Sequence, residues 1–80
     1  MLQELQTKNK VVGLKQLRKA LTEGRAAKVF VAQDADPKLT DPIRETCKAG
    51  GVPTEDVPTM IQLGQACDIE VGAAVAGLLR

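Results

Sequence analysis

The sequence contains no histidine, tryptophan or tyrosine, and Phe30 is its only aromatic residue. A chain so poor in aromatic side chains does not fit the RNA-binding modules that stack bases on aromatic platforms, such as the RRM sheet or the OB barrel. The absence of histidine removes the usual general base and the imidazole partner of a cysteine nucleophile. The sequence also lacks a Walker A loop, a G-x-G-x-x-G and a CxxC pair. We therefore expect no enzyme, no metal site and no cofactor.

Long hydrophobic runs are also absent. The longest apolar run, Val71 to Leu79, is about half of the ~18 residues that cross a bilayer. Residues 1–5 have neither the charged start nor the apolar stretch of a signal peptide. These features predict a cytoplasmic protein without membrane contact. In that reducing compartment Cys47 and Cys67 are expected to be small core residues, with a disulfide as the alternative.

The 80 residues are expected to form one domain, residues 1–80. Hydrophobic residues make up 44% of the chain and charged residues 26%, which is typical of a folded domain rather than a disordered one. The net charge of +1 hides an asymmetry: residues 1–30 sum to +5 and residues 31–80 to −4. Such asymmetry suggests a side that binds a polyanion, and the alternative is a mixed solvated surface.

Helical and strand patterns alternate along the chain, which predicts an α/β/α sandwich. We expect a short helix over 2–6, a strand at Val11-Val12 closed by Gly13, and a helix over 14–23 stopped by Gly24. A strand over 28–32, buried on both faces, comes next, and then a helix over 42–49 with Thr40-Asp41 as cap, Pro42 at its first position and Gly50-Gly51 as its end. The chain is expected to finish with a weak acidic strand over 52–57, a helix over 60–67 capped by Thr59, a loop over 68–72 and a last strand over 73–79.

The start of the second predicted helix is the first candidate site. Lys15 and Gln16 lie in its first turn, directly after Gly13. A lysine there meets the positive end of the helix dipole, which is mildly unfavourable unless an anion or an acceptor-rich ligand binds. Lysine donates to guanine O6 and N7, and glutamine pairs with an adenine edge. Arg18, Lys19, Lys10 and Lys28 are then candidates for phosphate contacts, and the alternative is an exposed helix face with solvated lysines.

The predicted loop before the last strand is the second candidate. Ile69 and Val71 flank Glu70 there, and two branched apolar residues in a loop suit the covering of an unstacked base. The alternative is that both residues begin the packing of the last strand. Asp34 and Asp36 form a close acidic pair, but Asp36 precedes a proline and is ordinary turn chemistry.

Three stretches carry a resemblance to a known family. The chain resembles the L-seven-Ae and L-thirty-e ribosomal proteins, and especially their short bacterial YbxF/YlxQ-type relatives, over roughly residues 10–80. The stretches are Gly13-Leu14-Lys15-Gln16-Leu17-Arg18-Lys19-Ala20-Leu21, Val29-Phe30-Val31-Ala32-Gln33-Asp34-Ala35-Asp36-Pro37 and, most specifically, Leu63-Gly64-Gln65-Ala66-Cys67-Asp68-Ile69-Glu70-Val71-Gly72-Ala73-Ala74.

This resemblance implies a mixed sheet of about four strands and the binding of kink-turns, RNA bends built on tandem sheared G·A pairs. Lys15 and Gln16, with Lys19 beside them, would meet the exposed guanine edges. Ile69-Glu70-Val71 would cover the extruded nucleotide, and Lys28 would lie near the phosphates. The implied partner is a structured ribosomal or other non-coding RNA, bound by a monomer. The alternative is a protein-interaction or regulatory module on the same fold that does not bind RNA.

Overall fold

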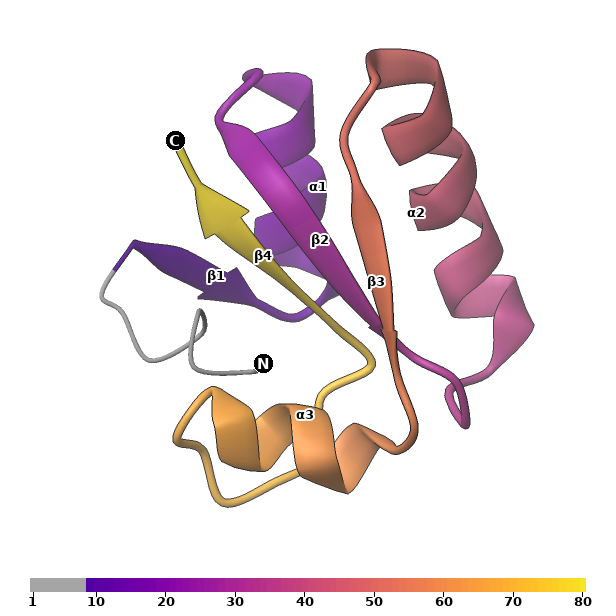
Figure 1. Ribbon diagram of the computed structural model, residues 1–80, viewed down its shortest axis with the longest axis vertical. Helices are drawn as coiled ribbons and strands as arrows, with labels where there is room; N and C mark the ends of the chain where they lie inside the picture. The colour runs from indigo at the N-terminus through magenta and orange to yellow at the C-terminus, as the bar shows by residue number, and fades with distance from the viewer. Residues whose placement is uncertain (1–8) are drawn as a thin grey trace.

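A mixed four-stranded sheet forms the centre of the molecule (Figure 1). The computed structural model describes residues 9–80. The elements are β1 (Lys10–Val12), α1 (Leu14–Thr22), β2 (Ala26–Ala32), α2 (Pro37–Gly50), β3 (Thr54–Val57), α3 (Met60–Ala66) and β4 (Val75–Leu79). The strand order is β1-β4-β2-β3, in which β4 runs antiparallel to both of its neighbours and β3 runs parallel to β2.

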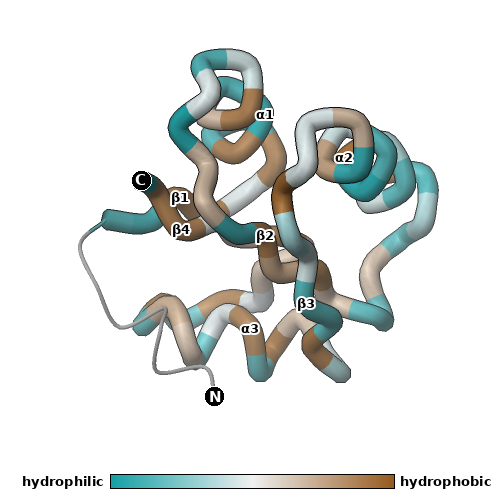
Figure 2. The backbone as a smooth tube through the Cα atoms, turned by 45° about the horizontal axis from the view of Figure 1, so that its top comes forward, coloured by the Kyte–Doolittle hydropathy of each residue, from teal (hydrophilic) through white to brown (hydrophobic). Residues whose placement is uncertain are grey.

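The helices lie on both faces of this sheet. Figure 2 shows α1 and α2 over one face and α3 over the other. Successive side chains of a strand point to opposite faces, so β2 serves both layers. Val29 and Val31 pack with Leu17 of α1 and Ile43 of α2, whereas Phe30 packs with the residues of α3. The predicted three-layer α/β/α sandwich and the doubly buried strand are therefore confirmed.

The start of α2 differs from the prediction. The helix begins at Pro37, not at Pro42, and its N-cap is Asp36, whose carboxylate accepts a hydrogen bond of 2.9 Å from the amide of Lys38. Thr40, predicted as part of the cap, lies buried inside the helix. Pro42 is also inside, where its missing N–H forfeits one intrahelical bond. The chain contains two Asp-Pro pairs, and the first of them begins the helix.

The acidic strand β3 pairs in parallel with β2, and each of its acids meets a cation. Glu55 lies on the α3 face of the sheet and pairs with Lys28 of β2, with 3.0 Å between Nζ and Oε1. Asp56 pairs with Arg44 of α2 on the opposite face, at 2.7 Å. The strand is shorter than expected and starts at Thr54. The other strands also differ at one end: β2 begins two residues earlier than predicted, at Ala26, and β4 begins two residues later, at Val75.

Several smaller predictions can be compared directly. Thr59 caps α3 by accepting a hydrogen bond of 3.0 Å from the amide of Gln62, as expected. Cys47 and Cys67 are free thiols buried in the two separate clusters, and burial raises the pKa of both. Gly24 has a φ of 69° directly after the cap of α1, in keeping with its role as a stop. The helix expected over 2–6 lies outside the described residues.

No helix among residues 9–80 is long and apolar enough to cross a membrane.

Candidate functional site

The start of α1 is held against the sheet by Gly13. Its φ of 97° is a conformation that side-chain-bearing residues rarely adopt, so a glycine is required at this turn. The amide of Gly13 donates to the carbonyl of Val75, at 3.0 Å, and thereby ties the turn to the first residue of β4. Gly13 offers no side-chain cap and the first turn contains no acid. The N–H groups of that turn therefore have neither a capping side chain at Gly13 nor a carboxylate of the same turn to satisfy them.

The outward face of α1 is basic. Lys15, Gln16, Arg18 and Lys19 are all exposed, while Leu17 and Ala20 on the opposite face are buried against the sheet. Lys15, Arg18 and Lys19 form no ion pair with a described residue. Nine residues of helix extend over about 13 Å, so the three charges form a short stripe that begins at the helix start.

The loop between α3 and β4 is laid directly on α3. The amide of Ile69 donates to the carbonyl of Gly64 at 3.0 Å, and the amide of Ala73 donates to the carbonyl of Met60 at 2.9 Å. The loop backbone approaches so closely that a Cβ atom on Gly64 would overlap the carbonyl oxygen of Val71. Two hydrogen bonds and this close contact therefore fix the loop along the length of the helix.

The three predicted loop residues take different positions. Ile69 is half-buried and packs against the α3-side core, which agrees with the structural alternative for that residue. Glu70 is exposed, and Val71 is 71% exposed. An aliphatic side chain presented to solvent by a firmly held backbone is free to contact a ligand.

The structure brings the helix start and the loop to the same end of the sheet. Gly13 is hydrogen-bonded to Val75. Val71 precedes Val75 by four residues, so the Cα atoms of Val71 and Val75 are at most about 14 Å apart. Lys15, Gln16, Glu70 and Val71 therefore flank the beginning of β4.

Lys28 is placed elsewhere. It lies on β2, four residues before Ala32, or about 13 Å along the strand from the end where α1 begins. Its ammonium is paired with Glu55 and lies 5.0 Å from the centroid of the Phe30 ring. It points to the α3 side of the sheet, whereas Lys15 and Lys19 belong to the opposite layer. The structure therefore does not gather Lys28 with the other candidates.

Sequence reasoning missed the residues that hold the loop. Gly64 and Gly72 both sit where a Cβ atom would press on neighbouring atoms, at Val71 and at Met60 respectively. Asp68 has a φ of 63° and makes the turn out of α3. Gly64 alone had a detectable signal in the sequence. A glycine inside a helix lowers its stability, so its presence there indicates that another part of the backbone comes close to the helix.

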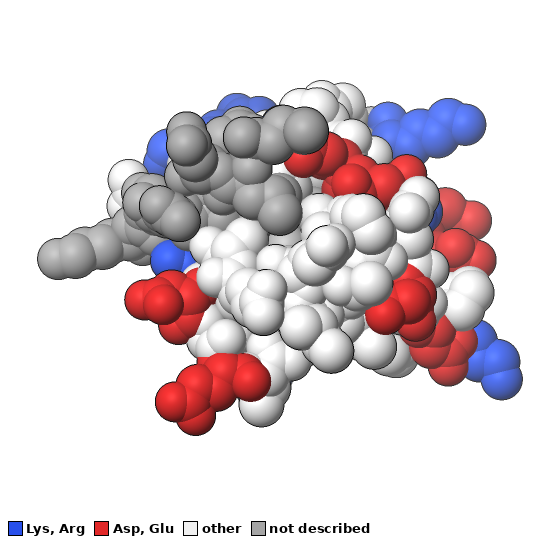
Figure 3. All heavy atoms as spheres, turned by 60° about the horizontal axis from the view of Figure 1, so that its bottom comes forward, with Lys and Arg blue, Asp and Glu red and all other residues white. Residues whose placement is uncertain are grey.

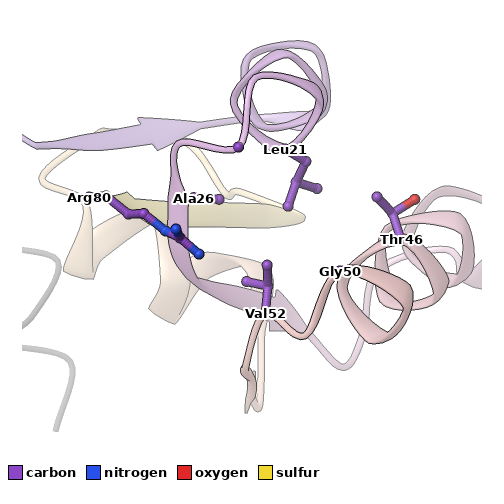
Figure 4. A pocket seen from close by; sticks show the side chains of 7 residues that line it. Leu21, Ala26, Thr46, Gly50, Val52 and Arg80 are labelled. Carbon is purple, nitrogen blue, oxygen red and sulfur yellow. The ribbon is translucent and has the colours of Figure 1, made fainter.

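The structure also contains a hollow that none of the predicted site residues lines (Figure 4). It has a volume of about 260 Å³ and opens between the last turns of α1 and α2, at the end of α1 opposite to Gly13. Its lining consists of Leu21, Gly24, Ala26, Thr46, Gly50, Val52 and Arg80. Within residues 9–80, no three His, Cys, Asp or Glu side chains are grouped so as to hold a metal ion.

Comparison with known proteins places this architecture in a family. The model of the ribosomal protein L7Ae/L30e/S12e/Gadd45 family matches residues 1–79. The chain belongs to this family. Among its curated relatives is an RNA-binding protein of Geobacillus sp. (strain WCH70), 47% identical over 76 residues, a match that covers 95% of this chain and 93% of the relative. The RNA-binding protein YbxF of Geobacillus stearothermophilus is 42% identical with the same coverage.

Solved structures of the family's fold agree with the chain along almost its whole length. The 15.5 kD RNA-binding protein of Giardia lamblia superimposes with a TM-score of 0.88 at 27% identity, over 99% of this chain and 68% of that one. A Bacillus halodurans protein of unknown function superimposes with a TM-score of 0.87 at 22% identity, over 99% of this chain and 83% of that one, and shows the fold alone. The resemblance inferred from the three sequence stretches is thus confirmed at the level of the family and its fold.

Proposed function

We propose that this protein binds RNA and that its target is a kink-turn with tandem sheared G·A pairs. The observation that carries the proposal is the start of α1, where exposed Lys15 and Gln16 extend from a first turn without a side-chain cap or an acid. Donors at a helix start favour acceptor-rich and negatively charged ligands. The purine edges exposed by sheared pairs, together with the adjoining phosphates, are such a ligand.

The arrangement of the site supports a division of roles. Lys15 and Gln16 read base edges, and Arg18 and Lys19 along the same helix meet phosphates. Val71, exposed on the loop that flanks the start of β4, covers a nucleotide that leaves the stack, and Glu70 accepts hydrogen bonds from it. Ile69 supports this loop from the core side. Gly13 contributes by holding the helix start in place.

The names of several relatives support RNA as the partner, because both Geobacillus proteins and the Giardia lamblia protein are described as RNA-binding. We propose that this protein acts as a cytoplasmic monomer on ribosomal or another non-coding RNA, as a ribosome-associated protein or a component of another ribonucleoprotein. Catalysis forms no part of the proposal.

A calorimetric titration against a simple kink-turn RNA tests the proposal. The control is the same RNA with its tandem G·A pairs replaced by Watson–Crick pairs, at the same salt concentration because affinity depends on salt. We expect tight binding to the first RNA that is lost with the second. Equal, weak binding to both would reduce the interaction to polyelectrolyte attraction and refute kink-turn recognition.

The double variant Lys15→Ala/Gln16→Ala tests the site itself. Each bidentate base contact is worth about 1–3 kcal/mol, so the variant should bind the kink-turn at least about tenfold more weakly. Both side chains are exposed, so circular dichroism and thermal unfolding should match those of the parent. Unchanged affinity in the folded double variant would move the site away from the start of α1.

A further inference from the structure

Gln33 follows the last residue of β2, at the end of the sheet where α1 begins. Its amide donates to the carbonyl of Val57 at 2.8 Å, so its backbone still pairs with β3. Two residues earlier, Val31 lies opposite Val75 of β4, the residue to which Gly13 is hydrogen-bonded. One strand spacing and two residues of strand put the Cα atom of Gln33 at most about 12 Å from that of Val75. Gln33 therefore lies beside the candidate site, on the β2 side of β4.

The side chain of Gln33 belongs to the face of the sheet that α1 covers. Successive side chains of a strand point to opposite faces. Ala32 packs in the α3-side core, and the carboxylate of Asp34 accepts a hydrogen bond of 2.7 Å from the first amide of α3. Val31 packs on the other face, in the cluster that contains residues of α1. Gln33 continues the row of Val31 and so shares its layer with Lys15.

The protein leaves the side chain of Gln33 available for a ligand. The carboxylates of its neighbours Asp34 and Asp36 accept hydrogen bonds from the starts of α3 and α2. The exposed side chain of Gln33 forms no hydrogen bond with a described residue. A primary amide donates two hydrogen bonds and accepts others without carrying charge.

The charges around Gln33 favour a base edge over a phosphate as its partner. Asp34, Asp36 and Lys38 give residues 33–38 two negative charges and one positive charge, a net charge of −1. A phosphate oxygen beside two carboxylates would be repelled by one more charge than Lys38 offsets. Glutamine reads purine edges in nucleic-acid recognition, and N7 is the acceptor that guanine and adenine share on the edge it reads.

We propose that Gln33 is a further specificity-determining residue of the RNA site, and that its amide N–H donates to N7 of a purine in the kink-turn. This inference rests on the proposed function and adds a base contact from the sheet to those from α1. Because β3 and β4 hold the backbone on both sides, only the side chain of Gln33 has to be ordered when the RNA binds.

A double-mutant cycle between protein and RNA tests this contact. Gln33→Ala should bind the kink-turn about tenfold more weakly, with an unchanged slope of log affinity against log salt because the side chain is uncharged. In a set of kink-turn RNAs, 7-deazapurines replace the purines one at a time, and each replacement removes one N7 acceptor. At one position the replacement should weaken binding by the parent about tenfold and leave the affinity of Gln33→Ala unchanged. Parent-like affinity in Gln33→Ala, or equal effects on both proteins at every purine, overturns the proposal.

Gln65→Ala is the matched control, because Gln65 is also an exposed glutamine but lies on α3, in the opposite layer. It should bind as the parent does, and both variants should keep the Tm of the parent. A lowered Tm in Gln33→Ala, with a loss of affinity that couples to no purine, would give Gln33 a structural role and also overturn the proposal. A parent that does not distinguish the kink-turn from its Watson–Crick control refutes the proposed function, and this inference with it. A parent that does so, with no coupling at Gln33, refutes this inference alone.

Discussion

Asp68 occupies a backbone conformation that suits glycine better. Its φ of 63° falls in the left-handed region, at the position where helices commonly end with glycine. An L-residue there costs roughly 1 kcal/mol, although a short polar side chain tolerates it better than most. We expect Asp68→Gly to raise the free energy of unfolding by about 1 kcal/mol and the Tm by roughly 4–8 °C, measured by thermal denaturation.

Asp68→Asn is the matched control for this prediction. Asparagine removes the same negative charge and also tolerates the left-handed region, so it should leave the Tm close to that of the parent. A gain in Tm of equal size in both variants would assign the effect to charge rather than to the backbone. An unchanged Tm in Asp68→Gly would show that the conformation of Asp68 carries no strain.

The ion pair between Lys28 and Glu55 bears on how much Lys28 contributes to RNA affinity. We expect Lys28→Ala to weaken kink-turn affinity modestly and equally for matched and mismatched motifs, because a phosphate contact carries no sequence information. Since the Glu55 carboxylate lies 3.0 Å from the ammonium and offsets its charge, Glu55→Ala should strengthen RNA binding. Titrations of both variants at one salt concentration check these outcomes. A loss of discrimination in Lys28→Ala would contradict a phosphate role, and a lack of effect in both variants would show that Lys28 takes no part in RNA binding.

Among the secondary-structure elements, α3 has an additional role as the support of the loop that presents Val71. Because a Cβ atom on Gly64 would overlap the Val71 carbonyl, Gly64→Ala must displace the loop or the helix. We expect a destabilisation of about 1–3 kcal/mol and, in the protein that remains folded, a loss of kink-turn affinity with amide shifts concentrated in residues 68–73.

Gly50→Ala provides the comparison, since it is also a helix glycine and its Cβ atom would meet only the Val52 side chain at an ordinary 3.9 Å. It should bind RNA as the parent does. Full affinity in folded Gly64→Ala would mean that the loop position does not matter for binding.

The limits of prediction from sequence are clearest at α2 and β3. Asp36-Pro37 and Asp41-Pro42 carry the same local signal for a helix start, so propensity alone does not distinguish them. The choice depends on tertiary structure: Asp36 directly follows the turn that Asp34 fastens to α3. The acids of β3 argue against a strand until Lys28 and Arg44 are known to stand opposite them. α1 and β2 could be predicted, because the hydrophobic pattern of each segment alone marks the residues that become buried.

The same limit applies to the candidate site. The position of Lys15 and Gln16 follows from helix periodicity and the preceding glycine, which are local properties. The close approach of Val71 to Gly64 and the distance of Lys28 from α1 follow from packing between separate elements, which no local pattern contains. The candidate ligand-contacting residues of α1 could thus be proposed from local patterns, whereas the residues that hold the loop in place could not.

For the whole molecule, the distribution of charge predicts how binding depends on salt. The net charge is only +1, so the protein as a whole attracts RNA weakly. Lys15, Arg18 and Lys19 of α1 pair with no described residue and form the stripe that we propose meets the RNA. In the view of Figure 3, Asp and Glu side chains lie around a largely uncharged area. The two phosphate contacts proposed for Arg18 and Lys19 correspond to a slope of log affinity against log salt of roughly −1.8. We therefore expect the electrostatic attraction for RNA to be modest and to act mainly through α1.

Arg18→Ala/Lys19→Ala should remove most of that slope, because each phosphate contact contributes close to one unit. Arg44→Ala is the matched control: Arg44 is also a helix arginine, but it lies on α2 and is paired with Asp56 at 2.7 Å. It should leave the slope unchanged. Titrations at four salt concentrations against the same kink-turn RNA measure both variants. If Arg44→Ala lowered the slope as much as the α1 variant, the attraction would come from the charge of the whole protein, and the stripe on α1 would have no special part in holding the RNA.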